Sequence, residues 1–297
     1  MTASASRAEA RAGWAFVAPA LLLIGVFFAI PVCGAFLLSF TDFDLYSIAD
    51  FGSTRFVGLK NYRDLMGTPL FWTALRNTTY FVVVGGPLSA AASLAAAVLV
   101  NARMLRFKPL FRSAFFAPWV TTLVAVAIVW RYIYHPQYGL VNAGLAHLGI
   151  GPIDWLGNPH WAMPAIILLS VWKNFGYNML VFLAGLQAIP EELYEAAALD
   201  GAGAWHRFRH ITLPMLAPTF VFVGVVTMIA SFQIFSEPYV MTQGGPLKAT
   251  ETLVLFMYEE GFRWWRLGFS AAIAVVLFGL TLVGTLVQLQ IRKRSAL

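Results

Sequence analysis

The chain has 297 residues, of which 59% are hydrophobic and 11% are charged, and its formal net charge is +6. Soluble domains carry about 25% charged residues, so the composition excludes a soluble globular protein and indicates an integral membrane protein. The basic residues lie in short clusters between apolar runs, as membrane topology signals do, so the positive charge does not indicate binding to nucleic acid.

The first apolar run, residues 13–40, follows a polar tail of residues 1–12. The apolar core of a signal peptide has about 7–15 residues, and this run is longer and lacks a clear cleavage site. We therefore interpret it as a retained first membrane span after a cytoplasmic tail. The sequence contains no low-complexity linker and no segment with the composition of a second domain. It therefore predicts one transmembrane domain over residues 13–297, with its core at about 72–290.

Five further apolar runs are long enough to cross a bilayer as helices. Residues 89–97 in the first of them are mostly small, so this segment is expected to pack closely against protein. The fold class predicted is an all-α integral membrane protein with six transmembrane helices. The five runs are residues 74–100, 110–134, 162–188, 215–241 and 267–290.

The distribution of Lys and Arg predicts the orientation of the chain. The segment 101–112 carries Arg103, Arg106, Lys108 and Arg112, whereas residues 135–161 carry no Lys or Arg. Because cytoplasmic loops are enriched in basic residues, both termini and the polar segment 190–214 are expected on the cytoplasmic side.

The polar segment between the fourth and fifth runs predicts two short helices joined by a turn. Glu191 and Glu192 place negative charge at the start of the first helix, residues 191–199, where the helix dipole favours it. Asp200 and Gly201 then break this helix, because glycine adopts positive φ without strain. A basic second helix is expected over residues 205–211.

This segment resembles the EAA loop of permease subunits of binding-protein-dependent ABC importers. The pattern is Glu-Ala-Ala, three residues, Gly, nine residues, and Ile-x-Leu-Pro, and every spacing is matched. The resemblance implies the type I importer fold, with coupling helices in this loop that dock on an ATP-hydrolysing subunit. The residues that would carry this role are Glu195, Ala196, Ala197, Asp200, Gly201, Ile211, Leu213 and Pro214.

Polar side chains at membrane depth are candidates for a substrate pathway. Asn174, Tyr177 and Asn178 are spaced i, i+3, i+4 and are expected to share one helix face. Gln233 and Glu237 are four residues apart and are expected to share a face of another helix. Amides and aromatic rings suit the hydroxyls and the C–H face of a saccharide, although such residues also hold helices together. The candidates are Trp172, Lys173, Asn174, Tyr177, Asn178, Gln233 and Glu237.

At residues 172–178, 183–190 and 244–246 the chain resembles carbohydrate permeases of the maltose and glycerol-phosphate type, and this wider resemblance covers nearly the whole sequence. It implies a sugar importer in the cytoplasmic membrane of a bacterium, with a second, non-identical permease, an ATPase dimer and an external solute-binding protein as partners. The chain has no P-loop, no catalytic cluster and no metal-ligand spacing, so ATP and Mg would act in the partner and this chain would bind no cofactor. Import of glycerol 3-phosphate or a glycerophosphodiester, an ion-driven carrier and a membrane enzyme are the alternatives.

Overall fold

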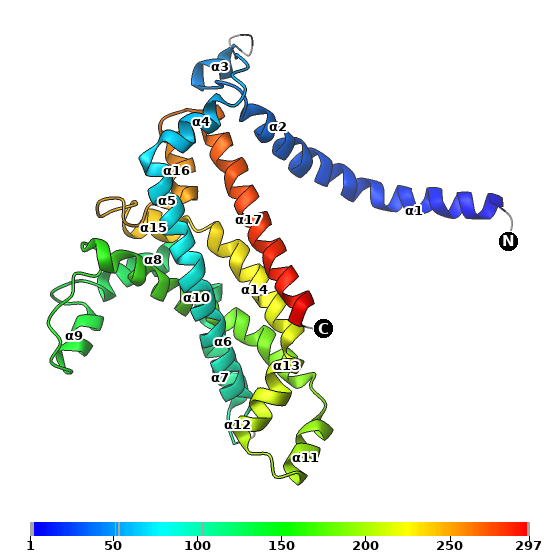
Figure 1. Cartoon of the computed structure of the whole chain (residues 1–297), viewed down its shortest axis with the longest axis vertical. Helices are drawn as coiled ribbons and strands as arrows, with labels where there is room; N and C mark the ends of the chain where they lie inside the picture. The colour runs from blue at the N-terminus through cyan, green and yellow to red at the C-terminus, as the bar shows by residue number, and fades with distance from the viewer. Residues whose placement is uncertain (1–2, 51, 53, 103, 296–297) are drawn as a thin grey trace. The chain divides into compact units, whose positions relative to one another are not determined.

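A computed structural model describes residues 3–50, 52, 54–102 and 104–295, and this part of the chain is helical (Figure 1). Two bent helix pairs, with angles of 99° and 65° at their breaks, bring the candidate spans from four to six if each pair is one span. The predicted all-helical membrane fold is therefore observed. The four continuous spans are Arg11–Leu38, Pro69–Asn101, Pro159–Gln187 and Leu267–Gln290.

The contacts divide the chain into two compact units, Met1–Thr68 with Met257–Val276 and Pro69–Phe256 with Leu277–Leu297. Each is described here by itself. Two helices, α16 (Leu253–Tyr258) and α17 (Leu267–Ser295), run through both. The other elements of the first unit are α1 (Ala3–Ile24), η1 (Gly25–Ala29), α2 (Ile30–Leu38), α3 (Leu45–Ala49), α4 (Lys60–Gly67) and η5 (Glu259–Arg263).

Within the first unit, α4 is a short helix that follows the first span. It is joined to the end of α2 by the buried side chain of Asn61, which donates to the carbonyls of Ser39 at 2.9 Å and Thr41 at 2.8 Å. Tyr62 adds a hydroxyl contact of 2.7 Å to Ser39. These bonds satisfy backbone carbonyls that the end of a helix leaves without partners.

The second unit contains the elements around α10 (Pro159–Gln187), the longest helix in it. Its α9 (Leu140–Ala146) lies in the segment 135–161, which the sequence predicts as a loop. Arg103, one of the basic residues predicted between the second and third spans, lies outside the described residues. The remaining elements are α5 (Pro69–Tyr80), η3 (Phe81–Gly85), α6 (Gly86–Asn101), α7 (Lys108–Val120), α8 (Leu123–Ile133), α11 (Glu191–Leu199), α12 (Ala204–Arg207), η4 (Phe208–Thr212), α13 (Leu213–Met215), α14 (Ala217–Phe232) and α15 (Ser236–Met241).

Helix α10 is the centre of the second unit, and buried side chains occur along its whole length. It begins at Pro159 because the Asn158 side chain accepts the amide of His160 at 2.9 Å as an N-cap. Helix α6 packs along it through the small residues that the sequence singles out. The buried residues of α6 are Ser89, Ser93, Ala96, Ala97 and Val100.

The third span is not the single helix over residues 110–134 that the sequence predicts. Helix α7 ends at Val120, Thr121 and Thr122 are extended, and α8 continues at an angle of 99°. The hydroxyl of Thr121 donates to the carbonyl of Pro118 at 2.6 Å, which satisfies one of the carbonyls that the break exposes. Lys173 of α10 also binds the carbonyls of Pro118, Trp119 and Thr121.

The fifth span, predicted over residues 215–241, also differs, because α14 ends at Phe232. Pro238 has no amide hydrogen, and its ring would clash with the carbonyl of Ile234 in a continuous helix. That carbonyl instead accepts the hydroxyl of Thr252 at 3.0 Å. A proline and a threonine remote in sequence therefore interrupt the span after residue 232.

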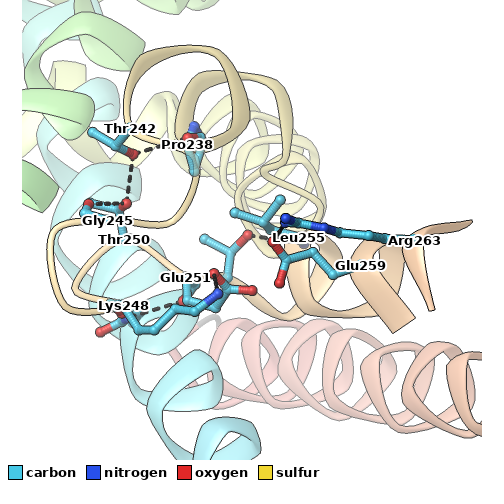
Figure 2. A network of polar contacts seen from close by, with 11 residues as sticks. Pro238, Thr242, Gly245, Lys248, Thr250, Glu251, Leu255, Glu259 and Arg263 are labelled. Atoms are coloured by element: carbon cyan, nitrogen blue, oxygen red, sulfur yellow. Dashed lines mark hydrogen bonds and ion pairs between the residues drawn. The ribbon is translucent and has the colours of Figure 1, made fainter. Parts of the chain in front are cut away.

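The segment 242–252 after this break is a turn held by side chains, and Figure 2 shows its polar contacts. Thr250 donates to the carbonyl of Gly245 at 2.7 Å, and its hydroxyl lies 2.6 Å from that of Thr242. Lys248 Nζ lies 3.2 Å from Glu251 Oε2, and Glu251 is fully buried. From α5, Asn77 donates to the carbonyls of both Lys248 and Glu251 at 2.9 Å, so the turn is fixed to the second span.

Candidate functional site

A cavity of about 240 Å³ lies in the second unit, where α6, α7, α10 and the broken end of α14 meet. Ligand sites in proteins usually have volumes of about 300–1,000 Å³, so this cavity is smaller than a complete site for a drug-sized ligand. The residues that line it come from four stretches remote in sequence. They include Phe81, Gly85, Ser89, Trp119, Ser170, Asn174, Tyr177, Asn178, Thr227, Ser231, Gln233, Ser236 and Glu237.

Helix α10 contributes Asn174, Tyr177 and Asn178, which the helical spacing predicts on one face, and all three line the cavity. The amide nitrogen of Asn178 donates to the Thr227 hydroxyl at 3.2 Å, and that of Asn174 donates to the Ser170 carbonyl at 2.8 Å. Within the part of the chain described, neither Oδ1 atom accepts a hydrogen bond. Both can therefore accept from hydroxyl groups of a ligand.

Two stacked aromatic rings line the same cavity as these amides. The rings of Trp119, at the end of α7, and Tyr177 are stacked with centroids 4.7 Å apart and an interplanar angle of 21°. Flat aromatic surfaces are large, apolar and rigid, and the indole and the phenol each add one polar group. The combination suits a ligand with apolar C–H faces and hydroxyl edges.

The break after α14 supplies Gln233, Ser236 and Glu237 to the cavity. The sequence-based expectation that Gln233 and Glu237 share a helix face is wrong, because α14 ends before Gln233 and α15 begins at Ser236. The break nevertheless brings both side chains to the same cavity. Glu237 is 8% exposed and is the charged residue among the described residues of the lining.

Two of the predicted pathway residues lie elsewhere. Trp172 points to the other side of α10, where its ring lies 5.4 Å from that of Trp130 and lines an apolar hollow. Lys173 is buried, and its ammonium group is bound to backbone carbonyls at the break between α7 and α8. Consecutive helix positions point about 100° apart, so residues 172 and 173 cannot both face the cavity that Asn174 lines.

The sequence gives little sign of the other lining residues. Trp119 lies in an apolar run without polar periodicity, and Ser170 and Thr227 are polar residues common in membrane helices. The nearest signal is the position of Ser170 four residues before Asn174 on one face of the same helix. Nothing in the sequence alone places Trp119 beside Tyr177.

The predicted coupling segment forms a separate site. Helix α11 spans Glu191–Leu199 as expected, and Gly201 has φ +77°. The amide of Ala202 donates to the carbonyl of Ala197 at 2.8 Å, and that of Gly201 to Ala198 at 3.1 Å. This is a Schellman C-cap, and it explains why glycine occupies position 201.

The two halves of this segment differ in exposure. Glu195, Ala196, Asp200 and Gly201 are exposed, and Ala197 is half-buried beside them. At the other end, Ile211 packs against the buried cluster between α6 and α10, and Leu213 is half-buried beside the exposed Pro214. The Tyr194 and Thr212 hydroxyls, 2.9 Å apart, join the halves.

Exposed apolar side chains also mark the surface of this segment. Leu199 is 90% exposed and Trp205 is 70% exposed. The Trp205 ring stacks on that of Phe208 in the same segment, with the ring centroids 5.6 Å apart.

Among the residues described, no group of three or more His, Cys, Asp or Glu side chains is placed to hold a metal ion.

Comparison with known proteins supports one family. The family described as binding-protein-dependent transport system inner membrane component matches residues 18–296. The arabinooligosaccharides transport system permease protein AraP of Bacillus subtilis is 38% identical over 288 residues, covering 94% of this chain and 88% of that protein. The lactose transport system permease protein LacF of Rhizobium radiobacter is 40% identical over 255 residues, covering 84% and 83%.

The fold has a solved counterpart. A chain of a bacterial alginate ABC transporter, solved in complex with an alginate pentasaccharide-bound periplasmic protein, superposes with a TM-score of 0.80 at 21% identity, covering 96% of this chain and 95% of that chain. The family match spans nearly all of the sequence, and the helical fold agrees with it. The chain belongs to the permeases of binding-protein-dependent ABC transporters, non-catalytic membrane subunits whose ATPase is a partner protein.

Proposed function

We propose that this chain is a permease subunit of a saccharide importer and that its cavity forms half of the translocation pathway. The observation that carries the proposal is the cavity itself, which is lined by the Trp119–Tyr177 stack together with the amides of Asn174 and Asn178. Relatives named for transport of arabinooligosaccharides and lactose support the same ligand class.

A neutral ligand suits the cavity better than glycerol 3-phosphate. The side chain that could attract a phosphate, Lys173, is not in the lining, and its ammonium group is bound by three carbonyls. The lining instead contains the carboxyl group of Glu237. A phosphate in this cavity would therefore meet a carboxyl group and no cation among the described residues of the lining.

The proposed assembly includes a second, non-identical permease, an ATPase dimer and an extracytoplasmic solute-binding protein. Both termini and the 190–214 segment would lie in the cytoplasm, and ATP and Mg would be used by the ATPase, so this chain would bind no cofactor. The cavity of about 240 Å³ in this chain fits a pathway whose other half comes from the second permease.

The two sites are connected through α13 and α14, which meet at a bend of 65° at residue 216. The coupling segment leads through α13 into α14, and the far end of α14 carries Thr227 and Ser231 in the cavity wall. A helix of 16 residues is about 24 Å long and nearly rigid. Closure of an ATPase dimer that holds α11 would therefore move the cavity wall, which is the basis of alternating access in this proposal.

The test is transport by the complete importer in proteoliposomes, with lactose, maltose, arabinotriose and glycerol 3-phosphate as probes. We expect ATP-dependent uptake of a neutral saccharide and no competition from glycerol 3-phosphate. Uptake of glycerol 3-phosphate alone would contradict the ligand class. Uptake driven by an ion gradient without ATP would contradict the coupling.

A further inference from the structure

We infer that Lys173 is a positioning residue that fixes the break in the third span and, through it, the Trp119 ring in the cavity wall. The inference rests on the proposed function only for the class of ligand that the cavity binds. Its geometric part concerns the backbone at residues 118–122 and stands without any ligand.

The break between α7 and α8 leaves backbone groups without helical partners. The last carbonyls of a helix have no amide four residues on to bind, and here Thr121 and Thr122 are extended. The hydrocarbon core of a bilayer supplies no hydrogen-bond donors, so each such group needs a partner from the protein or from water in a cavity. Donors from elsewhere in the protein therefore stabilise a bend of 99° within a membrane span.

The Lys173 side chain supplies these donors from α10. Its Nζ lies 2.8 Å from the carbonyl oxygen of Thr121, 3.1 Å from that of Pro118 and 3.4 Å from that of Trp119. An ammonium group has three N–H donors and no acceptor, so three carbonyls match its capacity. Its positive charge also complements the negative end of the α7 dipole.

A close approach of the two helices brings Lys173 within reach. Gly176 lies three residues after Lys173 on α10, and a Cβ there would overlap the carbonyl oxygen of Phe115 on α7. Only glycine permits this backbone contact. Among the described residues Lys173 forms no ion pair, and the acidic group that interacts with it electrostatically is Glu237.

The consequence for the cavity follows from Trp119, whose carbonyl is one of the three. The same residue stacks its ring on Tyr177, four positions after Lys173 on α10. Lys173 and Tyr177 therefore hold the backbone and the ring of one residue from one helix. Without the ammonium group, we expect the break to open and the Trp119 ring to leave its place against Tyr177.

The first test is hydrogen–deuterium exchange on the complete importer in lipid nanodiscs, without any saccharide. Lys173→Met keeps a long apolar side chain and removes the donors, and we expect about ten-fold faster exchange in peptides covering residues 119–126, as loss of charged hydrogen bonds implies. Lys173→Arg should keep most of the protection. Lys108→Met is the matched control, because Lys108 binds the Asn101 carbonyl at 3.2 Å at the other end of α7.

The second test is a double-mutant cycle on the half-saturation concentration for uptake of whichever probe, lactose, maltose or arabinotriose, the importer transports. We expect Lys173→Met and Trp119→Ala each to raise it, and the double variant to resemble Trp119→Ala alone, because both changes remove the same ring from the wall. A purely structural lysine would lower the maximal rate and leave the half-saturation concentration unchanged.

Wild-type exchange at residues 119–126 in Lys173→Met would overturn the inference, and so would fully additive effects with Trp119→Ala. If Lys173→Met does not assemble, the same measurements on Lys173→Gln decide. Because the exchange test uses no ligand, an importer that takes none of the saccharides would contradict the proposed function and leave the role of Lys173 to be judged by exchange alone.

Discussion

At the residue scale, Asp42 orders the loop that follows the first span. Its carboxylate accepts the amide of Arg55 at 2.7 Å and the side-chain Nε of Arg55 at 2.9 Å. The backbone hydrogen bond from Arg55, together with the guanidinium charge, lowers the pKa of Asp42 below its usual value, although burial opposes the shift. The ionised carboxylate is therefore the form that the folded loop favours.

The sign of the pH dependence follows from this shift. A carboxyl group with a lowered folded pKa stabilises the fold above its unfolded pKa, and this contribution is lost as the pH falls through the folded pKa. We expect Asp42→Asn to reduce amide protection of residues 41–56 at neutral pH, with wild type and variant converging in acid.

Hydrogen exchange measured across that pH range checks this prediction, and Asp64→Asn, on the exposed face of α4, is the control. Equal protection of wild type and Asp42→Asn at neutral pH would show that the charge of Asp42 does not order the loop.

Some single residues could be assigned from the sequence alone. Gly201 was predictable as a positive-φ position, because a helix rich in alanine stops there, and the Schellman bonds confirm it. Asn174, Tyr177 and Asn178 were predictable as one face from spacing within one helix. Trp119 was not, because its place beside Tyr177 depends on the backbone contact between α7 and α10, which no local pattern records.

At the element scale, the breaks in the helices determine the site. The sequence predicts continuous third and fifth spans, because hydropathy measures length and composition and does not detect a bend. The bend in the third span is bound by Lys173, a side chain remote in sequence, and the free carbonyl of Ile234 after the end of α14 is bound by another, Thr252. Pro238 was a visible local signal for a kink or helix end at about residues 234–237, a few residues after the observed end of α14.

The turn at residues 242–252 is the element that joins the fifth-span break to α5 (Figure 2). Gly244 has φ +80°, and a Cβ there would overlap the buried carboxylate of Glu251, which Lys248 also binds. Gly201 has a similar φ of +77°, but a Cβ there would meet nothing within 4 Å. An alanine at position 201 would therefore cause backbone strain alone, whereas an alanine at position 244 would cause backbone strain and a steric clash.

We predict that Gly244→Ala lowers stability more than Gly201→Ala does. The left-handed backbone costs an alanine about 1–2 kcal/mol at either position. Overlap with Glu251 adds roughly 1–3 kcal/mol at position 244 alone. Thermal unfolding of the purified complex compares the variants, and equal melting temperatures would mean that the turn yields to the added methyl group.

At the scale of the whole molecule, the polar segment 190–214 leads through α13 into α14, whose far end lines the cavity. The residues of the 190–214 segment predicted its first helix with the bounds observed, 191–199, whereas the second helix, expected over residues 205–211, begins at Ala204 and continues through η4 and α13 to Met215. The cavity was predicted only in part, because its lining is assembled from several helices. Five of the seven predicted residues line it, and Trp172 and Lys173 do not.

If the ATPase acts through the coupling segment, variants of this segment should lose ATP-driven uptake but still assemble with their partners. We expect Glu195→Arg or Gly201→Asp to abolish ATP-driven saccharide uptake while the complex still assembles in the membrane, because both alter the exposed surface of α11 and its C-cap. Lys60→Glu, a charge reversal at the exposed start of α4, should transport normally. Normal uptake by both segment variants would show that the ATPase does not act through this segment.

The most direct test of the account is saccharide uptake by the reconstituted importer carrying Asn178→Ala or Tyr177→Ala, compared with Thr281→Ala, whose hydroxyl binds within α17 and lies outside the cavity. Removing one side chain that contacts a ligand costs about 1–3 kcal/mol, so we predict a half-saturation concentration raised about ten-fold by each cavity variant and unchanged in Thr281→Ala. If all three variants match the wild type, the saccharide does not contact this chain at the cavity, and the assignment of the pathway is wrong.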